Sequence, residues 1–412
     1  MLEKDFLFRI KEKGGTAYLV GGAVRDMIMS RVSNDRDYVI TGFTEDKLFS
    51  LFPDAQRVGK SFPVYLIEIS GEKCEVSLAR RESKQGHGYR GFSVSFTPDI
   101  TIEEDLFRRD TTMNAIAYNP LTEEFTDPYG GYGDIKNRLV RAVSEHFTED
   151  PVRALRAARQ ASEFDFDIDS RTVAYMRECE EELKAEPSER IVAETARALC
   201  CTMPSGFFRN LESAGLLEVV YPWLHRLIGK TQPPEYHPEG DAFEHTMKVL
   251  DDVALATERP EVRFAALMHD IGKSVTPEDE LPHHYGHEKK GMPVLSEINS
   301  VMRFPSLWIE CAEFVIKEHM RANRLGKASK ITELVVALSK HPIGAEGFIP
   351  IVRADNNRIL ADYLENYELY LSAVNSVSSL TIPDTLTGAE IGRWLFERKT
   401  DAVAELIKKR GS

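Results

Sequence analysis

The stretch AYLVGGAVRDMIMSRVSNDRDYVIT, residues 17–41, holds an apolar strand pattern, a glycine pair, a helix pattern and a second strand. Glycines between a strand and a helix let a phosphate approach the backbone, and the helix N-terminus adds N–H donors and partial positive charge. On the second strand Asp35 and Asp37 project to one face while Arg36 points away. Two carboxylates so close repel each other unless a cation lies between them. A turn followed by a strand with a charged end is the alternative interpretation of these residues taken alone.

The glycine pair is Gly21 and Gly22, and Arg25 follows one turn into the predicted helix. An arginine at that place adds a charge-assisted hydrogen bond to a bound phosphate. Only about a dozen residues separate the pair from Asp35 and Asp37. One strand-turn-helix unit therefore brings phosphate donors and metal ligands to the same place.

Length and composition limit the classes of protein to consider. The chain has 412 residues, enough for two to four domains, and 42% of them are hydrophobic. No apolar run is long enough to cross a bilayer and no signal peptide opens the sequence, so the cytoplasm is the expected compartment and no membrane partner is expected. Five cysteines without a CxxC pair predict free thiols. The net charge of −14 limits any nucleic-acid site to a local basic patch.

The patterning changes along the chain, and it predicts an α+β protein in four parts. Residues 1–140 mix strand and helix patterns, which predicts an α/β layer. Residues 141–230 carry only amphipathic helix patterns, and we expect a helix bundle there. Residues 229–241 are rich in Pro, Gly and charge, which is typical of a linker. A histidine-rich helical part at 231–360 and C-terminal helices at 361–412 complete the prediction.

Two further motifs add charge to helix starts. In RRDTTMNA, Arg108, Arg109 and Asp110 precede an apolar helix, where a solvated helix start capped by Asp110 is the alternative. In EDPVRALRAAR, Asp150 and Pro151 are a good helix start. Arginines then recur at every third position and drift slowly around one side of the helix. They are Arg153, Arg156 and Arg159.

The motifs GGAVRD with DRD, RRDTTMNA, DPYGGYGDI and EDPVRALRAAR, in this order, resemble the tRNA nucleotidyltransferases of the bacterial and eukaryotic CCA-adding class, in the polymerase-beta superfamily. The resemblance covers residues 16 to 225. It implies a polymerase-beta-like head followed by all-α parts. It also implies addition of C, C and A from CTP and ATP to the 3′ end of tRNA, at the acceptor stem.

The resemblance assigns roles residue by residue. Asp35 and Asp37 would be catalytic and hold two Mg²⁺ ions, which activate the RNA 3′-hydroxyl and neutralise the leaving pyrophosphate. The expected triphosphate and ribose ligands are Gly21, Gly22, Arg25, Arg109 and Asp110. The expected base-reading residues are Asp150 and Arg153, supported by Glu149, Arg156 and Arg159. Gln160 is a departure, because related sequences commonly carry an aromatic there.

The segment CEVSLAR, residues 74–80, resembles the motif before the family's flexible loop. Glu75 and Arg80 match its acidic and basic positions. The polar, glycine-rich residues that follow predict a mobile loop within 81–98.

The second half carries a histidine constellation in FEHTMKVLDD, LMHDIGK, HHYGHEKKG and IKEHM. His269 and Asp270 are adjacent on an apolar helix, where burial is costly unless a divalent cation compensates. Four ordered groups make a set of unrelated surface or core histidines improbable. The pattern resembles an HD domain, a metal-dependent phosphohydrolase fold. The expected ligands are His245, His269, Asp270 and His319, with His284 or His287 near the site and Asp355 as a further acidic candidate.

One bacterial subgroup of CCA-adding enzymes carries such an HD domain, with phosphatase and 2′,3′-cyclic phosphodiesterase activities. The resemblance implies a transition metal such as Ni²⁺, Co²⁺ or Mn²⁺ in this site. Met320 follows His319 at a position where such enzymes can have Asp. This departure bears on whether the HD domain is active as an enzyme and leaves the expected HD fold unaffected.

Several alternatives stay open on the sequence alone. An A-adding or CC-adding enzyme shares these motifs, although a flexible loop at 81–98 disfavours a CC-only enzyme. A bacterial poly(A) polymerase also shares them but usually carries a strongly basic C-terminal extension, and here only IKKRGS is basic. A nucleotide phosphohydrolase with an idle nucleotidyltransferase-like RNA-binding module is disfavoured by the intact Asp35 and Asp37. The oligomeric state is open.

Overall fold

The computed structural model describes residues 1–32, 36–59, 63–84, 92–235, 238–378, 382–383 and 385–410. The chain forms two compact units. The first comprises Met1–Glu194 and Gly206–Val220, and the second comprises Thr195–Ser205 and Tyr221–Ser412. The predicted four-part division is finer than these units and stays a prediction.

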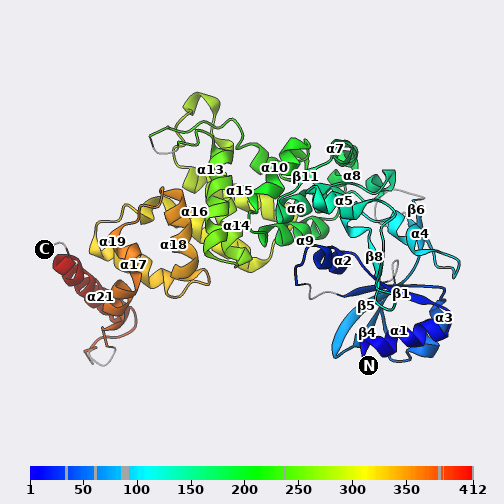
Figure 1. The fold of residues 1–412 in the computed structure, drawn as a ribbon. Helices are drawn as coiled ribbons and strands as arrows, with labels where there is room; N and C mark the ends of the chain where they lie inside the picture. The colour runs from blue at the N-terminus through cyan, green and yellow to red at the C-terminus, as the bar shows by residue number, and fades with distance from the viewer. Residues whose placement is uncertain are drawn as a thin grey trace. The chain divides into compact units, whose positions relative to one another are not determined.

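A mixed sheet of seven strands, within the described residues, builds the head of the first unit (Figure 1). Its order is β3-β4-β5-β2-β1-β8-β9, with β2 and β5 parallel and the other neighbours antiparallel. The strands are β1 (Thr16–Val20), β2 (Asp37–Thr41), β3 (Gln56–Val58), β4 (Val64–Ile69), β5 (Glu72–Leu78), β8 (Ala117–Asn119) and β9 (Glu124–Thr126). A separate hairpin pairs β6 (Arg81–Lys84) with β7 (Phe92–Ser95).

The two faces of this sheet bury different helices. Helix α1 (Glu3–Glu12) packs Phe6 edge-on against Tyr38 of β2, with ring centroids 5.2 Å apart. Since side chains alternate along a strand, Asp37 and Val39 face the opposite side. There Val39 joins a buried cluster with Leu106 of α4 (Ile102–Phe107). Burial of apolar side chains on both faces thus fixes the register of β2, and Asp37 lies on the face that packs against α4.

Helices follow the sheet in the first unit. After β1 and β2 come α2 (Gly22–Ile28) and α3 (Glu45–Leu51). The turn η2 (Thr112–Asn114) precedes β8, and after β9 come α5 (Gly131–Lys136), the turn η3 (Glu145–Glu149) and α6 (Val152–Phe164), with the short strands β10 (Leu139–Val140) and β11 (Asp167–Ile168). The remaining helices are α7 (Ser170–Glu178), α8 (Glu180–Lys184), α9 (Ser188–Leu199), α10 (Ser205–Ser213) and α11 (Leu217–Val220).

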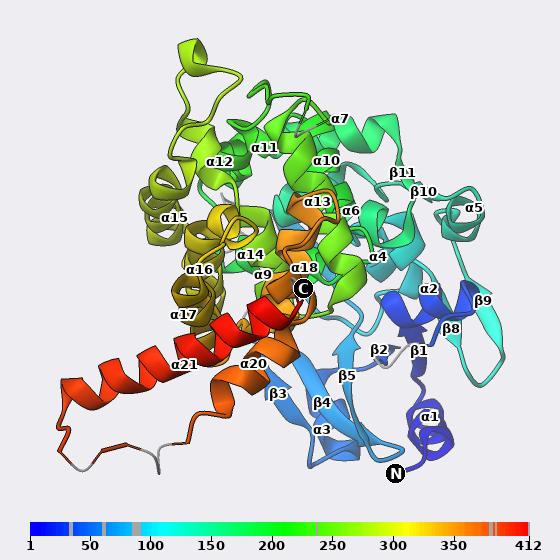
Figure 2. The ribbon, with the colours of Figure 1, turned by 90° about the vertical axis from the view of Figure 1, so that its left-hand side faces the viewer.

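The described part of the second unit is helical, apart from the isolated bridge between Thr231 and Asp241. Its helices are α12 (Pro222–His225), α13 (Ala242–Ala256), α14 (Pro260–Met268), α15 (His287–Met302), α16 (Ser306–Ala322), α17 (Ala328–Leu338), α18 (Gly344–Asp355), α19 (Asp362–Glu365), α20 (Tyr367–Asn375) and α21 (Ala389–Arg410), with turns η4 (Ile271–Val275) and η5 (Glu278–Glu280). Helix α21 lies along α20 and α17 (Figure 2). Buried Arg263 of α14 donates to the carbonyls of Leu199, Cys201 and Ala254, and so satisfies carbonyls near the ends of α9 and α13.

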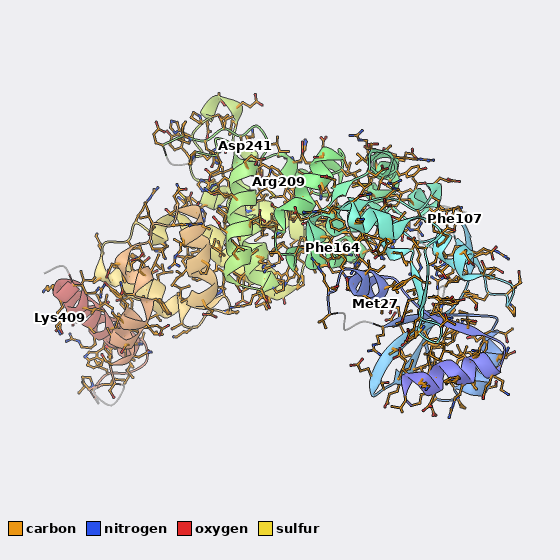
Figure 3. The ribbon with its side chains drawn as sticks, viewed as in Figure 1. Met27, Phe107, Phe164, Arg209, Asp241 and Lys409 are labelled. Atoms are coloured by element: carbon orange, nitrogen blue, oxygen red, sulfur yellow. The ribbon has the colours of Figure 1, made fainter. Side chains whose placement is uncertain are left out.

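The segment predicted as a linker is tied into the second unit. The N–H of Gln232 donates to the Gly240 carbonyl (3.0 Å), and that of Ala242 donates to the Lys230 carbonyl (3.0 Å). Asp241, labelled in Figure 3, caps α13 by accepting from the backbone of Phe243. The Pro-rich segment therefore lies inside the second unit, whose last stretch begins at Tyr221, and does not divide the two units.

The cysteines are free thiols. No helix in the described ranges is both long and apolar enough to span a membrane.

Candidate functional site

The glycine pair ends β1 and begins α2, as the sequence predicted. Gly21 has φ of 70°, which favours glycine, and α2 starts at Gly22. A Cβ added to Gly21 would lie 3.3 Å from Arg109 Nη1 and 3.9 Å from Asp37 Oδ2. The turn, the arginine and the carboxylate therefore meet at one point, and a side chain on Gly21 would occupy it. Asp35, the second predicted carboxylate, lies outside the described residues.

Asp37 is the first residue of β2, with Val20 and Glu75 as its register partners on the two sides. Its neighbours Arg36 and Tyr38 both contact Glu3 of α1, at 3.3 Å and 2.5 Å. The strand is thus held from the opposite face at the residues before and after Asp37.

Arg25 is held by three groups. Its Nη1 donates to Asn114 Oδ1 (3.0 Å), and its Nε and Nη2 donate to Asp26 Oδ1 (2.9 and 2.8 Å). The guanidinium also lies over the ring of Phe164, 4.5 Å from the centroid; Phe164 is labelled in Figure 3. Phe164 ends α6, so Arg25 links α2 to α6 within the first unit.

Three arginines share two buried carboxylates next to the glycine turn. Asp105 accepts from Arg108 and Arg109, and Glu82 accepts from Arg80 and Arg108. Burial by itself would raise the pKa of Asp105, but Arg108 and Arg109 hold it below its ordinary value. Burial lowers the pKa of Arg109, whose Nε has no acceptor among the described residues. This excess of positive charge suits an anion such as a phosphate.

Asp110 lies at the centre of a buried network. Its Oδ1 accepts from the Thr111 N–H (2.8 Å) and from Asn114 Nδ2 (3.2 Å), and its Oδ2 accepts from Gln160 Nε2 (3.2 Å) and lies 2.8 Å from Arg156 Nε. Burial would raise the pKa of Asp110, but Arg156 and the hydrogen bonds lower it well below its ordinary value. The carboxylate is therefore ionised and surrounded by donors.

The predicted base-reading pair makes separate contacts. Asp150 accepts from Arg190 Nη2 (2.8 and 3.0 Å). Arg153 donates to the carbonyls of His146 and Arg108, the latter at 2.7 Å. No local pattern marked Arg190 for this role, because it lies 40 residues from Asp150 on α9. Both members of the pair are fixed in place by residues outside their motif.

Other predicted residues lie around these. Arg159 donates to Glu194 (2.8 Å) and Glu163 (2.7 Å). Glu149 pairs with His146. Glu75 is exposed next to Asp37 in the sheet. Of the predicted loop at 81–98, residues 85–91 lie outside the described ranges.

The second unit gathers six of the predicted histidines and aspartates in one buried cluster. They come from five helices or their ends and are His245, His269, Asp270, His287, His319 and Asp355. Asp270 lies between two pairs of histidines, and each of its carboxylate oxygens faces one pair. Its Oδ2 faces the Nε2 atoms of His245 (3.7 Å) and His269 (3.2 Å), and its Oδ1 faces those of His287 (3.1 Å) and His319 (3.4 Å). Asp355 Oδ1 closes the first group, 3.1 Å from His245 Nε2.

The hydrogen bonds of three rings show which nitrogen faces the cluster. Nδ1 of His269, His287 and His319 lies 2.7 to 2.9 Å from the backbone carbonyls of Ala266, His284 and Val315. A carbonyl only accepts, so each Nδ1 carries the proton and Nε2 offers its lone pair to the centre.

These Nε2 atoms and both oxygens of Asp270 are buried without a hydrogen-bond partner among the described residues, although the Lys273 ammonium forms an ion pair with Oδ2 at 2.5 Å. A divalent cation satisfies such atoms, so the residues fit a metal site. Without a cation, Asp270 outweighs the lowering by burial and raises the pKa of His269 to about 10. Metal binding would therefore release a proton.

His284 and His287, left as alternatives by the sequence, are separated by their contacts. His287 belongs to the cluster, whereas the two ring nitrogens of His284 contact Thr276 Oγ1 (2.8 Å) and the Thr231 carbonyl (3.0 Å). Lys273 was missed, although it belongs to the HDIGK motif. Its ammonium lies 2.5 Å from Asp270 Oδ2 and donates to Gln232 Oε1 (2.5 Å), within the segment predicted as a linker.

Three family models match successive parts of the chain. Residues 17–141 match a model described as the Poly A polymerase head domain, and residues 165–228 match the "Probable RNA and SrmB- binding site of polymerase A". Residues 242–340 match the HD domain.

Curated relatives match over most of the chain. A "Multifunctional CCA protein" of Mannheimia succiniciproducens is 45% identical over 312 residues, which is 73% of each chain. A protein of the same name from Paracidovorax citrulli is 38% identical over 419 residues, covering 94% of this chain and 97% of its own.

Solved structures show the same fold. The CCA-adding enzyme of Bacillus stearothermophilus, in complex with CTP, has a TM-score of 0.68 at 22% identity and covers 97% of this chain and 92% of its own. A tRNA nucleotidyltransferase complexed with a primer tRNA and an incoming ATP analog has a TM-score of 0.59 at 20% identity, covering 89% and 97%. The predicted fold class, an α+β head followed by helical parts with an HD domain, is confirmed.

Proposed function

Because this chain belongs to the family of multifunctional CCA proteins, we propose that it adds C, C and A from CTP and ATP to the 3′ end of tRNA. The observation that carries this proposal is the meeting of Gly21, Arg109 and Asp37 at the strand-to-helix turn. A phosphate cradle beside a strand carboxylate is what nucleotidyl transfer requires. Work on tRNA would place the protein in the cytoplasm.

We assign the head residues as follows. Asp35 and Asp37 hold Mg²⁺, in a site for two ions, and the bound ions supply charge stabilisation to the attacking and leaving oxygens. Gly21 and Gly22 receive the triphosphate on the backbone, and Arg25 and Arg109 pair with its oxygens. The excess of arginines around Asp105 supports this assignment, because an added polyanion balances the buried charge.

Base reading is assigned to Asp150 and Arg153, with Arg156 and Arg159 in support. An acceptor and a forked donor complement the edges of cytosine and adenine without a nucleic-acid template. In the structure Arg190 holds the Asp150 carboxylate and two carbonyls hold Arg153. These contacts support a pre-set orientation for both side chains.

Full CCA addition is separated from CC-only and A-only addition by one experiment. tRNA ending before the tail, after C, or after CC is offered with labelled CTP and ATP, and the products are resolved by length. A complete enzyme extends all three to the same end. An A-adding enzyme extends only the last, a CC-adding enzyme stops at CC, and a poly(A) polymerase gives a ladder of A.

We propose that the HD half is a metal-dependent phosphohydrolase for phosphate monoesters or 2′,3′-cyclic phosphates. The buried Nε2 atoms around Asp270 support the site, and the two faces of Asp270 support one divalent ion on each side. Ni²⁺, Co²⁺ and Mn²⁺ suit imidazole and carboxylate ligands. When bound, such an ion supplies an activated water.

The test combines metal titration with activity. Calorimetric titration of the metal-stripped chain with each ion should show binding that His269→Ala removes. Hydrolysis of both substrate classes is then measured. Binding without hydrolysis would leave a structural metal site and turn attention to Met320. A chain that hydrolyses nucleotides but does not extend tRNA would favour the alternative of an idle nucleotidyltransferase module.

A further inference from the structure

Asn114 joins two residues of the proposed nucleotide site. Its side chain is 6% exposed. Its Oδ1 accepts from Arg25 Nη1 (3.0 Å) and its Nδ2 donates to Asp110 Oδ1 (3.2 Å). Arginine only donates and an ionised carboxylate only accepts, so the orientation of this amide is fixed by its partners.

Gln160 makes the matching connection from α6. It is 1% exposed, its Oε1 accepts from Thr111 Oγ1 (2.8 Å), and its Nε2 donates to Asp110 Oδ2 (3.2 Å). Gln160 is a polar side chain on the buried face of α6, and its hydrogen bonds are made by Thr111 and Asp110, which follow α4.

Asp110 is thereby held on both oxygens. Its Oδ1 accepts from the Thr111 N–H and from Asn114, and its Oδ2 accepts from Gln160. Arg156 Nε lies 2.8 Å from Oδ2 as an ion pair and has no hydrogen-bond partner among the described residues. The position of this carboxylate therefore sets the negative charge that Arg156 faces.

We propose that Asn114 and Gln160 are positioning residues for nucleotide addition: Asn114 holds Arg25 directly, and the two side chains together fix the Asp110 carboxylate that pairs with Arg156. The inference rests on the proposed function, because Arg25 and Arg156 act on a nucleotide only in that case. Arg25 belongs to the phosphate-binding helix and Arg156 to the base-reading helix. One buried network thus sets both ends of the nucleotide site.

The alternative partners of Arg25 explain why its position needs Asn114. Asp26 takes its Nε and Nη2, and Phe164 stacks on the guanidinium plane. Asn114 holds the third nitrogen, Nη1. Without Asn114 this nitrogen loses its acceptor, and Asp26 and Phe164 alone hold the guanidinium at the glycine turn.

Two variants separate the two arms. Asn114→Ala removes the connection to Arg25, and Gln160→Met fills the same space without hydrogen bonds. Because a hydrogen bond to a charged group is worth about a tenfold change in affinity, Asn114→Ala should weaken inhibition by pyrophosphate about tenfold. Gln160→Met should leave pyrophosphate inhibition unchanged and lower the kcat/KM ratio of CTP to UTP by about tenfold.

Exposed residues supply the controls. Asn137→Ala and Gln56→Met make the same chemical changes away from the site and should alter neither quantity. The thermal midpoint of every variant is measured beside the kinetics. Lower midpoints with unchanged inhibition and selectivity would show that Asn114 and Gln160 only stabilise the fold, and would overturn the proposal.

A double variant tests whether Asn114 acts through Arg25. In an Arg25→Ala background, Asn114→Ala should produce no further loss of pyrophosphate inhibition. Independent, additive losses would overturn the coupling. If Arg25→Ala itself leaves inhibition unchanged in an active enzyme, the assignment of Arg25 to the triphosphate fails, and the role of Asn114 fails with it. If Arg25→Ala weakens inhibition and Asn114→Ala does not, only the positioning role is refuted.

Discussion

Gly272, two residues after Asp270 in the HDIGK motif, offers a sharp test of the HD site. Turn η4, which contains Gly272, packs directly on α15, the helix that begins at His287. A Cβ on Gly272 would lie 2.0 Å from the His287 carbonyl oxygen and 2.6 Å from the Gly291 nitrogen. Both atoms are backbone, so the helix cannot yield by a rotamer change.

The size of the displacement follows from these distances. Real Cβ contacts essentially never fall below 3.0 Å, so the His287 carbonyl must move by about 1 Å in Gly272→Ala. His287 Nε2 lies 3.1 Å from Asp270 Oδ1, and the same movement carries it away from the cluster. A misplacement of about 1 Å can cost about 10²-fold in activity, and disturbed metal sites lose about 10- to 100-fold in affinity. Overpacking should also cost about 1 to 3 kcal/mol of stability.

The assay measures Mn²⁺ or Ni²⁺ affinity by calorimetry, hydrolysis of a 2′,3′-cyclic nucleotide, and CCA addition on the same preparation. Gly272→Ala should lose metal affinity and hydrolysis, while addition of nucleotides stays near normal. Gly326→Ala is the matched control, because its Cβ would meet nothing within 4 Å. A folded Gly272→Ala protein with wild-type metal affinity would refute the assignment of His287 to the site.

The remaining predictions concern four carboxylate and histidine side chains. Asp37→Asn should reduce CTP and ATP incorporation by several orders of magnitude and leave tRNA binding largely intact, and near-normal turnover would refute its metal role. Asp150→Ala should raise misincorporation of UTP or GTP, whereas a variant that is only less stable, by about 1 kcal/mol, would make Asp150 a helix cap. His269→Ala should abolish metal-dependent hydrolysis and spare CCA addition, as tested with both substrates. The pKa of Asp110 is depressed in the folded state, so its contribution to stability is complete above its unfolded value of about 3.9 and is lost as pH falls below that value. Asp110→Asn should therefore flatten the acid limb of the unfolding free energy in urea melts between about pH 4 and about pH 2.

The sequence by itself determined what local periodicity and backbone sterics control. The strand, glycine pair and helix at residues 17–29 follow from an apolar run, the positive φ that Gly21 adopts, and the helical pattern after it. Two-residue alternation put Asp37 on the face opposite Arg36 and Tyr38, and Glu3 contacts both of those residues. The adjacent His269 and Asp270 predicted a metal site because burial of such a pair needs compensation, and both residues do lie in the buried cluster.

Only the tertiary structure decided which distant groups complete each site. Arg190 holds Asp150, and Gln160 holds Asp110 across 50 residues, because helices brought together by apolar packing meet at positions that no local spacing encodes. Packing of α15 on η4 selected His287 over His284 for the metal cluster. The Pro-rich segment was predicted to be a linker because it lacks periodicity, yet its backbone hydrogen bonds place Gln232 against Lys273, beside the buried histidine and aspartate cluster. Periodicity fixes the face a side chain presents, whereas its partner depends on the packing of elements far apart in the chain.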